Sequence, residues 1–138
     1  MSRKKIWQSG FTLIELLVVL MIIGLLAALV GPRFIQQGEK GKITSVKAQI
    51  ALFDSALDMF KLDVGRYPNA QEGLQALRER PAGVERWDGP YLKKEIPKDP
   101  WAHSYVYRVP GENGPYDILS YGADGVAGGD GEAQDIGS

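Results

Sequence analysis

The fold of this chain is decided by one stretch near its N-terminus, Gly10-Phe11-Thr12-Leu13-Ile14-Glu15, which opens a long apolar run. Residues 11–30 contain a single charged side chain, that of Glu15. As a helix rising about 1.5 Å per residue, they span about 30 Å, the thickness of the hydrocarbon core of a bilayer. The residues before the run are basic, which favours a cytoplasmic N-terminus. We therefore predict a single membrane-spanning helix with the C-terminal domain on the other side.

A cleavable secretory signal is the alternative interpretation of this segment. Such a signal has a shorter apolar core that ends in a small-x-small cleavage site, and Ala27-Ala28-Leu29-Val30 matches that pattern poorly. The apolar run is also long, and it passes into a helical pattern rather than a loop. A retained anchor is therefore the preferred interpretation.

Glu15 is a carboxylate near the start of a membrane span, where an unpaired charge is costly. Two interpretations stay open from the residues alone. The carboxylate is solvated at the level of the headgroups, or it pairs with a cation at the same depth. A free amine on Phe11, produced by a cut after Gly10, would supply that cation.

The composition excludes several classes of function. The 138 residues contain no cysteine, which rules out disulfides, cysteine-based zinc sites and thiol nucleophiles. The single histidine, His103, leaves little for histidine-based catalysis. The net charge is −1, and without Arg3, Lys4 and Lys5 the rest of the chain carries −4. Such a mildly acidic body does not suggest nucleic-acid binding, which requires a basic face.

Residues 42–64 are predicted to form an amphipathic helix. Apolar side chains recur at alternating spacings of three and four: Ile43, Val46, Ile50, Phe53, Leu57, Phe60 and Val64. A helix laid on a sheet is favoured over a coiled coil, because about three heptads is short for a coiled coil. Between this helix and the apolar run, Gly31-Pro32 indicates either a kink or a helix end at the membrane surface.

The second half of the chain predicts a small sheet. Asn69 is suited to cap a short helix over residues 70–80, with Leu74 and Leu77 facing inwards. Residues 104–109 and 116–121 alternate as two strands joined by a turn. Helix first and antiparallel sheet afterwards is the order of an α+β fold.

The C-terminal segment, residues 122–138, combines glycines with Asp124, Asp130, Glu132 and Asp135. Glycine and carboxylates are suited to wrap a hard cation, but the segment is not an EF-hand, because Val126 and Gly128 stand where such a loop needs oxygen ligands. Composition alone favours a solvated, mobile acidic tail.

The N-terminal stretch resembles the class III signal of type IV pilins and pseudopilins. The basic leader, the Gly10-Phe11 junction, Glu15 and the apolar run occur together. The resemblance implies that a prepilin peptidase cuts after Gly10 and methylates the amine of Phe11. It also implies that Glu15 pairs with the N-terminal amine of a neighbouring subunit during assembly. The implied domains are a leader (1–10), a transmembrane and filament-core helix (11–34) and a periplasmic globular domain (35–138).

The globular part resembles the major pseudopilins of the type II secretion system. The matching words are Gly65-Arg66-Tyr67-Pro68, Glu72-Gly73-Leu74-Gln75-Ala76-Leu77, Asp99-Pro100-Trp101, and Tyr116-Asp117-Ile118 running into Ser120-Tyr121-Gly122-Ala123-Asp124-Gly125. The absence of cysteine agrees, because type IV pilins proper usually carry a C-terminal disulfide. Ala102 departs from the glycine that often follows Asp-Pro-Trp in the family, which concerns the local turn.

This resemblance implies a structural protein rather than an enzyme. Its subunits would wait in the bacterial inner membrane and polymerise into a helical periplasmic filament that drives export of folded proteins across the outer membrane. The implied partners are further copies of the chain, minor pseudopilins, the prepilin peptidase and the inner-membrane assembly platform, with no nucleic acid.

The resemblance also reverses the interpretation of the acidic tail, because major pseudopilins of this system bind one calcium ion there. Carried over, the ligands are the carboxylates of Asp124 and Asp135 and the backbone carbonyl of Tyr121. Asp130, or a carbonyl between Gly129 and Ala133, would complete the shell, since Gln134 stands where some relatives have another acidic residue.

Two other functions remain as alternatives. The first is another pilin-like subunit, such as a minor pseudopilin or a competence pilin. The second is a membrane-anchored, calcium-dependent enzyme that uses Asp54, Asp58 and Asp63 as acid–base groups. These three have helical spacing on a surface, and the chain has no Ser-His-Asp pattern or phosphate-binding glycine loop.

Overall fold

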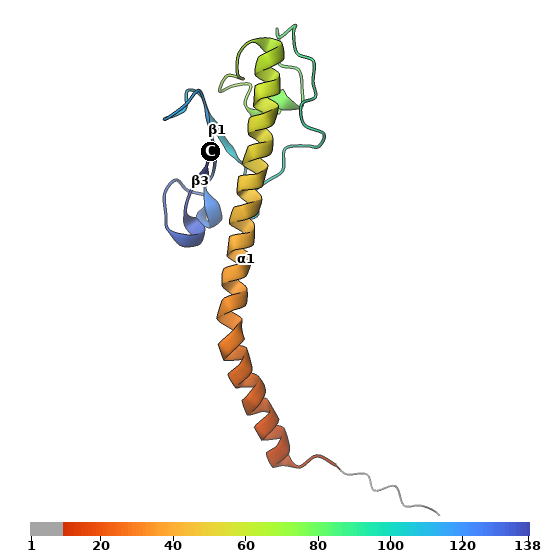
Figure 1. The fold of residues 1–138 in the computed structure, drawn as a ribbon, viewed down its shortest axis with the longest axis vertical. Helices are drawn as coiled ribbons and strands as arrows, with labels where there is room; N and C mark the ends of the chain where they lie inside the picture. The colour runs from red at the N-terminus through yellow and green to blue at the C-terminus, as the bar shows by residue number, and fades with distance from the viewer. Residues whose placement is uncertain (1–9) are drawn as a thin grey trace, which may run out of the picture. The chain divides into compact units, whose positions relative to one another are not determined.

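The computed structural model describes residues 10–138, apart from the side chains of residues 34, 35 and 132. Its elements, in chain order, are α1 (Leu13–Val64), η1 (Leu74–Leu77), β1 (Val106–Arg108), β2 (Asp117–Ser120), η2 (Gly122–Asp124), η3 (Gly131–Ala133) and β3 (Ile136–Gly137) (Figure 1). Contacts divide the chain after Gly38, and Glu39–Ser138 forms one compact unit. The predicted α+β class is confirmed, since a long helix accompanies one small antiparallel sheet.

The first part of α1 is apolar and exposed. The large side chains from Leu13 to Val30 are all substantially exposed, and by length and composition this is a helix that can cross a membrane. The helix continues through Pro32, so a helix end at Gly31-Pro32 is wrong. Proline removes only one donor from the hydrogen-bond ladder, and the bonds on either side of it persist.

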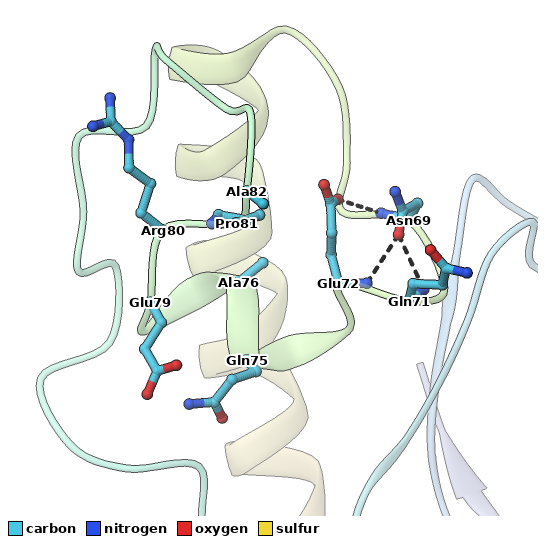
Figure 2. A pocket seen from close by; sticks show the side chains of 9 residues that line it. All are labelled: Asn69, Gln71, Glu72, Gln75, Ala76, Glu79, Arg80, Pro81 and Ala82. Carbon is cyan, nitrogen blue, oxygen red and sulfur yellow. Dashed lines mark hydrogen bonds between the residues drawn. The ribbon is translucent and has the colours of Figure 1, made fainter.

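The turn after α1 differs from the prediction. Asn69 Oδ1 does accept hydrogen bonds from the backbone N–H groups of Gln71 and Glu72, at 3.0 and 2.9 Å, and Glu72 Oε2 accepts one from the Asn69 N–H at 2.8 Å (Figure 2). The predicted α-helix over residues 70–80 is wrong, because Gly73 has a left-handed φ of 57° that no α-helix tolerates. Only the four residues of η1 become helical, as a 3₁₀ turn.

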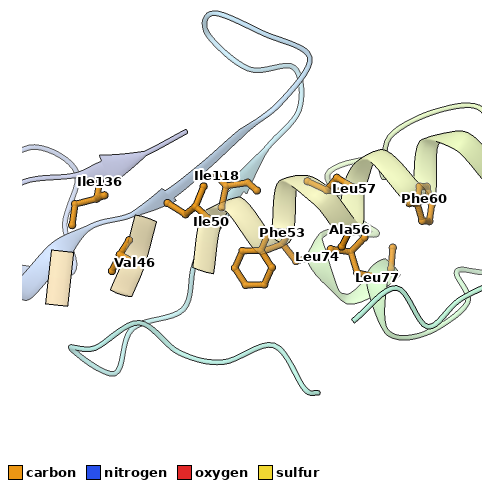
Figure 3. Close-up of a cluster of buried hydrophobic side chains, with 11 residues drawn as sticks. Val46, Ile50, Phe53, Ala56, Leu57, Phe60, Leu74, Leu77, Ile118 and Ile136 are labelled. Atoms are coloured by element: carbon orange, nitrogen blue, oxygen red, sulfur yellow. The ribbon is translucent and has the colours of Figure 1, made fainter. Parts of the chain in front are cut away.

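The second part of α1 contributes the core of the compact unit. Its predicted apolar stripe is buried, and η1 and the sheet cover it: the core comprises Val46, Ile50, Phe53, Ala56, Leu57, Phe60, Leu74, Ala76, Leu77, Ile118 and Ile136 (Figure 3). Phe53 and Tyr105 meet edge to face, with their ring centroids 5.2 Å apart. The helix is therefore laid on a sheet, as predicted, and is not half of a coiled coil.

The sheet has the order β1-β2-β3 and is antiparallel throughout. Strands β1 and β2 confirm the two predicted strands, although both are shorter than predicted, and Tyr107 lies opposite Ile118. Strand β3 was not predicted. It pairs Ile136 with Ser120 and buries Ile136 in the core, so the interpretation of the C-terminus as a mobile, solvated tail is wrong.

Three carboxylates on α1 each accept a hydrogen bond from a tyrosine of the surrounding loops. The pairs are Tyr116–Asp54 (2.9 Å), Tyr67–Asp58 (3.1 Å) and Tyr91–Asp63 (2.8 Å). Burial, reinforced by the hydrogen bond to Asp54, raises the pKa of the Tyr116 phenol well above its ordinary value. Burial, with the charge of Glu72 nearby, raises the pKa of the Tyr107 phenol in the same direction.

We expect core burial to separate two leucines of the same helix. Leu57 is fully buried and Leu52 is 58% exposed. Leu57→Ala removes packed methyl groups and leaves a cavity, so it should lower the free energy of unfolding by about 2–5 kcal/mol. Leu52→Ala is the matched control and should change it by less than about 1 kcal/mol. The measurement is denaturant unfolding of the full chain in detergent, followed by near-ultraviolet circular dichroism. Equal losses would contradict the assigned core.

We expect the compact unit to lose stability at alkaline pH. A raised phenol pKa means that the folded state favours the neutral form, so the stabilisation is complete below the unfolded pKa of about 10 and is lost as the pH rises beyond it. Melting temperature, measured by near-ultraviolet circular dichroism in steps above about pH 9, should fall, and phenolate absorbance from Tyr107 and Tyr116 should appear only with unfolding. Complete ionisation of all tyrosines in a still-folded chain would refute this.

Candidate functional site

The first candidate site is the Gly10–Phe11 bond and the helix start behind it. Gly10, Phe11 and Thr12 precede α1, and Phe11 is 85% exposed, so this peptide bond lies in open, non-helical chain. Residues 1–9 of the predicted leader lie outside the described residues. A protease needs accessible backbone outside regular structure, and the Gly10–Phe11 bond meets both conditions.

Thr12 defines where α1 begins. Its Oγ1 accepts a hydrogen bond from the backbone N–H of Glu15 at 3.2 Å, which makes Thr12 the N-cap and Glu15 the third helical residue. Thr-x-x-Glu is the sequence of a capping box, a signal that was available in the sequence. The first turn of a helix favours a carboxylate, because the backbone N–H groups there carry partial positive charge.

Glu15 itself is exposed and takes part in none of the ion pairs within residues 10–138. A carboxylate that is to sit in an apolar environment needs a cationic partner. Within the described part of the chain none is provided, so a partner of Glu15 would come from another molecule or from a new N-terminal amine.

The second candidate site is the acidic loop, residues 121–135, between β2 and β3. Its two short 3₁₀ turns, η2 and η3, contact each other, so the loop doubles back and brings its two ends together. Asp124 Oδ1 accepts a hydrogen bond from the Val126 N–H at 3.1 Å, and Asp135 Oδ2 accepts one from the Gly128 N–H at 2.8 Å. These hydrogen bonds from backbone N–H groups to the two carboxylates stabilise the conformation of the loop.

Asp135 supplies the observation that fits a cation. Its Oδ1 is buried and has no hydrogen-bond partner among residues 10–138. A buried carboxylate oxygen without a partner is costly, and carboxylate oxygens are ligands that hard cations prefer. Within residues 10–138 no three acidic or histidine side chains gather as a metal cluster, so Asp130 does not join Asp124 and Asp135 in one. A cation here would also need backbone carbonyls, such as that of Tyr121.

The sequence interpretation missed the residues behind this loop. Asp99 and Ser120 are buried polar residues, hydrogen-bonded to each other, and His103 reaches the loop at Gly122. The turn beginning at Asp99 forms even though Ala102 replaces the glycine of the family, and Ala102 takes a left-handed φ of 65°. The available signal was Asp99 before Pro-Trp, since aspartate bonds to the backbone two residues ahead.

The carboxylates considered above for acid–base catalysis form hydrogen bonds within the protein. Asp54, Asp58 and Asp63 each accept a tyrosine hydroxyl, and His103 is bonded to a backbone carbonyl. The cleft drawn in Figure 2, lined by residues that include Glu72, Glu79 and Arg80, contains no nucleophile next to a base. These contacts are structural in character.

Comparison with known proteins agrees with this geometry. The family described as "Type II secretion system (T2SS), protein G" matches residues 33–138, and the prokaryotic N-terminal methylation motif matches residues 8–31. The type II secretion system core protein G of Pseudomonas aeruginosa is 46% identical over 95% of this chain and 94% of its own length. The Vibrio cholerae protein of the same name is 42% identical over 95% and 91%.

The fold comparison points the same way. The crystal structure of the major pseudopilin from the type 2 secretion system of enterohaemorrhagic Escherichia coli superposes with a TM-score of 0.65 at 32% identity, covering 73% of this chain and 85% of that one. The likeness includes the long N-terminal helix packed on a three-stranded antiparallel sheet. The chain belongs to the type II secretion system protein G family, the family of the major pseudopilins.

Proposed function

We propose that this chain is the repeating subunit of a helical periplasmic filament that drives export of folded proteins across the outer membrane. Before assembly, the apolar part of α1 would hold each subunit as a single-pass protein of the inner membrane, with the compact unit in the periplasm. The observation that carries the proposal is the exposed apolar surface of the first part of α1, which ends in one carboxylate, Glu15. Such a surface needs an apolar environment, and a bilayer and a helical filament core both provide one.

Glu15 has a specific part in this proposal. A prepilin peptidase would cut after Gly10 and methylate the amine of Phe11, creating a cation four residues before the carboxylate along the chain. In a filament core, where the dielectric constant is low, Glu15 would pair with the amine of a neighbouring subunit. The charge is costly in an isolated helix, but as half of an ion pair it would set the alignment of neighbouring subunits.

The remaining partners follow from the family. Minor pseudopilins and the inner-membrane assembly platform would act with the growing filament, and the chain itself would carry out no catalysis. The match to protein G over residues 33–138 favours the major subunit over a minor pseudopilin or a competence pilin.

We propose further that the acidic loop binds one calcium ion. The ligands would be the carboxylates of Asp124 and Asp135 and the carbonyl of Tyr121, with backbone carbonyls between residues 129 and 133 completing the shell. The buried, unpartnered Oδ1 of Asp135 and the contact between η2 and η3 support this. The cation would offset the repulsion between the carboxylates and hold the loop closed against the sheet.

Glu15→Ala should separate membrane insertion from assembly. We expect insertion to be unchanged and filament formation to be lost, because the amine of the neighbouring subunit would be buried without its partner. The readouts are membrane fractionation, electron microscopy of filaments, and mass spectrometry for cleavage after Gly10 with one N-terminal methyl group. Glu15→Gln tests the charge alone, and Glu79→Ala, at an exposed residue, is the matched control. Normal filaments from both Glu15 variants would overturn the assigned role.

Calcium should raise the melting temperature of the full chain in detergent relative to chelator. At about 100 times the dissociation constant, linkage gives about 2.7 kcal/mol, which for a unit of this size is about 10 °C or more. Asp124→Asn and Asp135→Asn should abolish the increase, whereas Asp88→Asn, at an exposed residue, should keep it. The measurement is near-ultraviolet circular dichroism. Equal melting temperatures of the wild type with calcium and with chelator would exclude the site.

A further inference from the structure

A buried polar pair lies directly behind the acidic loop. Asp99 is 4% exposed and Ser120, the last residue of β2, is fully buried. The Ser120 hydroxyl donates to Asp99 Oδ2 at 2.7 Å. Asp99 Oδ1 accepts the backbone N–H groups of Trp101 and His103, at 3.0 and 2.9 Å. Because both carboxylate oxygens are used, the buried charge is compensated, and the pair can act as a rigid support.

This support holds the loop at Gly122, the first residue of η2. Ser120 has one proton and gives it to Asp99, so its oxygen is left to accept the Gly122 N–H, at 3.3 Å. The Gly122 carbonyl accepts from His103 Nδ1 at 3.1 Å, and this ring nitrogen carries the proton because a carbonyl can only accept. Four hydrogen bonds therefore close a ring through Asp99, Ser120, Gly122 and His103.

The ring fixes the direction of a neighbouring carbonyl. The Tyr121–Gly122 peptide is trans, so its carbonyl and its N–H point in opposite directions. Since the N–H is directed at the buried Ser120 oxygen, the Tyr121 carbonyl must point away from the buried pair. Rotation of this peptide would break the bond to Ser120.

The His103 ring also supports the far end of η2. Gly125 packs on it so closely that a Cβ there would lie 3.0 Å from the ring atoms Cε1 and Nε2. Gly125 has a left-handed φ of 67°, which glycine adopts without strain. His103 therefore contacts the loop on both sides of Asp124, at Gly122 and at Gly125.

We propose that Asp99, Ser120 and His103 are positioning residues of the calcium-binding loop, which fix the Tyr121 carbonyl and the segment carrying Asp124 before the cation arrives. This inference rests on the calcium site proposed above. Preorganised ligands bind more tightly because the cost of ordering the loop is met on folding and not on binding. None of the three residues touches the cation itself in this proposal.

The test is calcium titration by calorimetry of the full chain in detergent micelles. Asp99→Asn places an amide where the carboxylate accepts three donors, and Ser120→Ala removes the acceptor of the Gly122 N–H. Each should weaken calcium binding by about ten-fold, the effect of losing one buried hydrogen bond. The matched controls are Asp117→Asn, whose carboxylate accepts the Glu112 N–H away from the ring, and Ser55→Ala on α1, and both should bind calcium like the wild type.

His103 is only partly buried, so variants at this residue are expected to fold and test the same proposal. His103→Ala should weaken calcium binding, and His103→Asn, whose amide retains a donor near the position of Nδ1, should restore most of the affinity. A purely structural role would lower the calcium-free melting temperature of the variants and leave the dissociation constant unchanged. Unchanged dissociation constants in all three sets of variants would overturn this inference and leave the calcium site intact. A wild-type chain that binds no calcium would overturn both.

Discussion

Burial of one stripe of α1 is the interaction on which the rest of the compact unit depends. Phe53, Leu57 and Phe60 are fully buried. The same core contains side chains from η1, β2 and β3: Leu74, Leu77, Ile118 and Ile136 (Figure 3). The sheet is too small to be stable alone, since β3 has two residues and β1 three. The helix supplies the apolar surface on which such short strands can pair.

The same helix meets two different requirements. Residues 13–30 present apolar side chains without protein cover, and the stripe from Val46 to Phe60 is covered completely. The first requirement is satisfied by lipid or by other apolar helices, and the second by folding of the chain on itself. A structural subunit needs this division, because one surface must remain available for assembly while the other keeps the compact unit folded.

The polar contacts around the helix are arranged for support. Tyrosines from the loops donate hydrogen bonds to Asp54, Asp58 and Asp63, and the buried Asp99–Ser120 pair holds the start of the acidic loop. The other end of that loop enters the sheet through Ile136. The loop is thus attached at both ends, which explains how a glycine-rich acidic segment can keep a defined shape.

The sequence by itself determined the elements with strong periodicity and strong chemistry. The apolar run with Glu15, the stripe of residues 42–64 and the two longer strands were evident from spacing and composition, whereas composition alone made the glycine–carboxylate segment a mobile tail. Only the tertiary structure decided the rest. Gly73 limited the helix after Asn69 to one 3₁₀ turn, and two C-terminal residues became a strand because β2 offered an open edge. The Asp99–Ser120–His103 ring was also beyond the sequence, because its members lie up to 21 positions apart and their burial depends on how the turn at Asp99 packs behind β2. Local pattern specifies which surfaces are apolar, but the pairing of short strands and the burial of single polar groups are decided by contacts between distant residues.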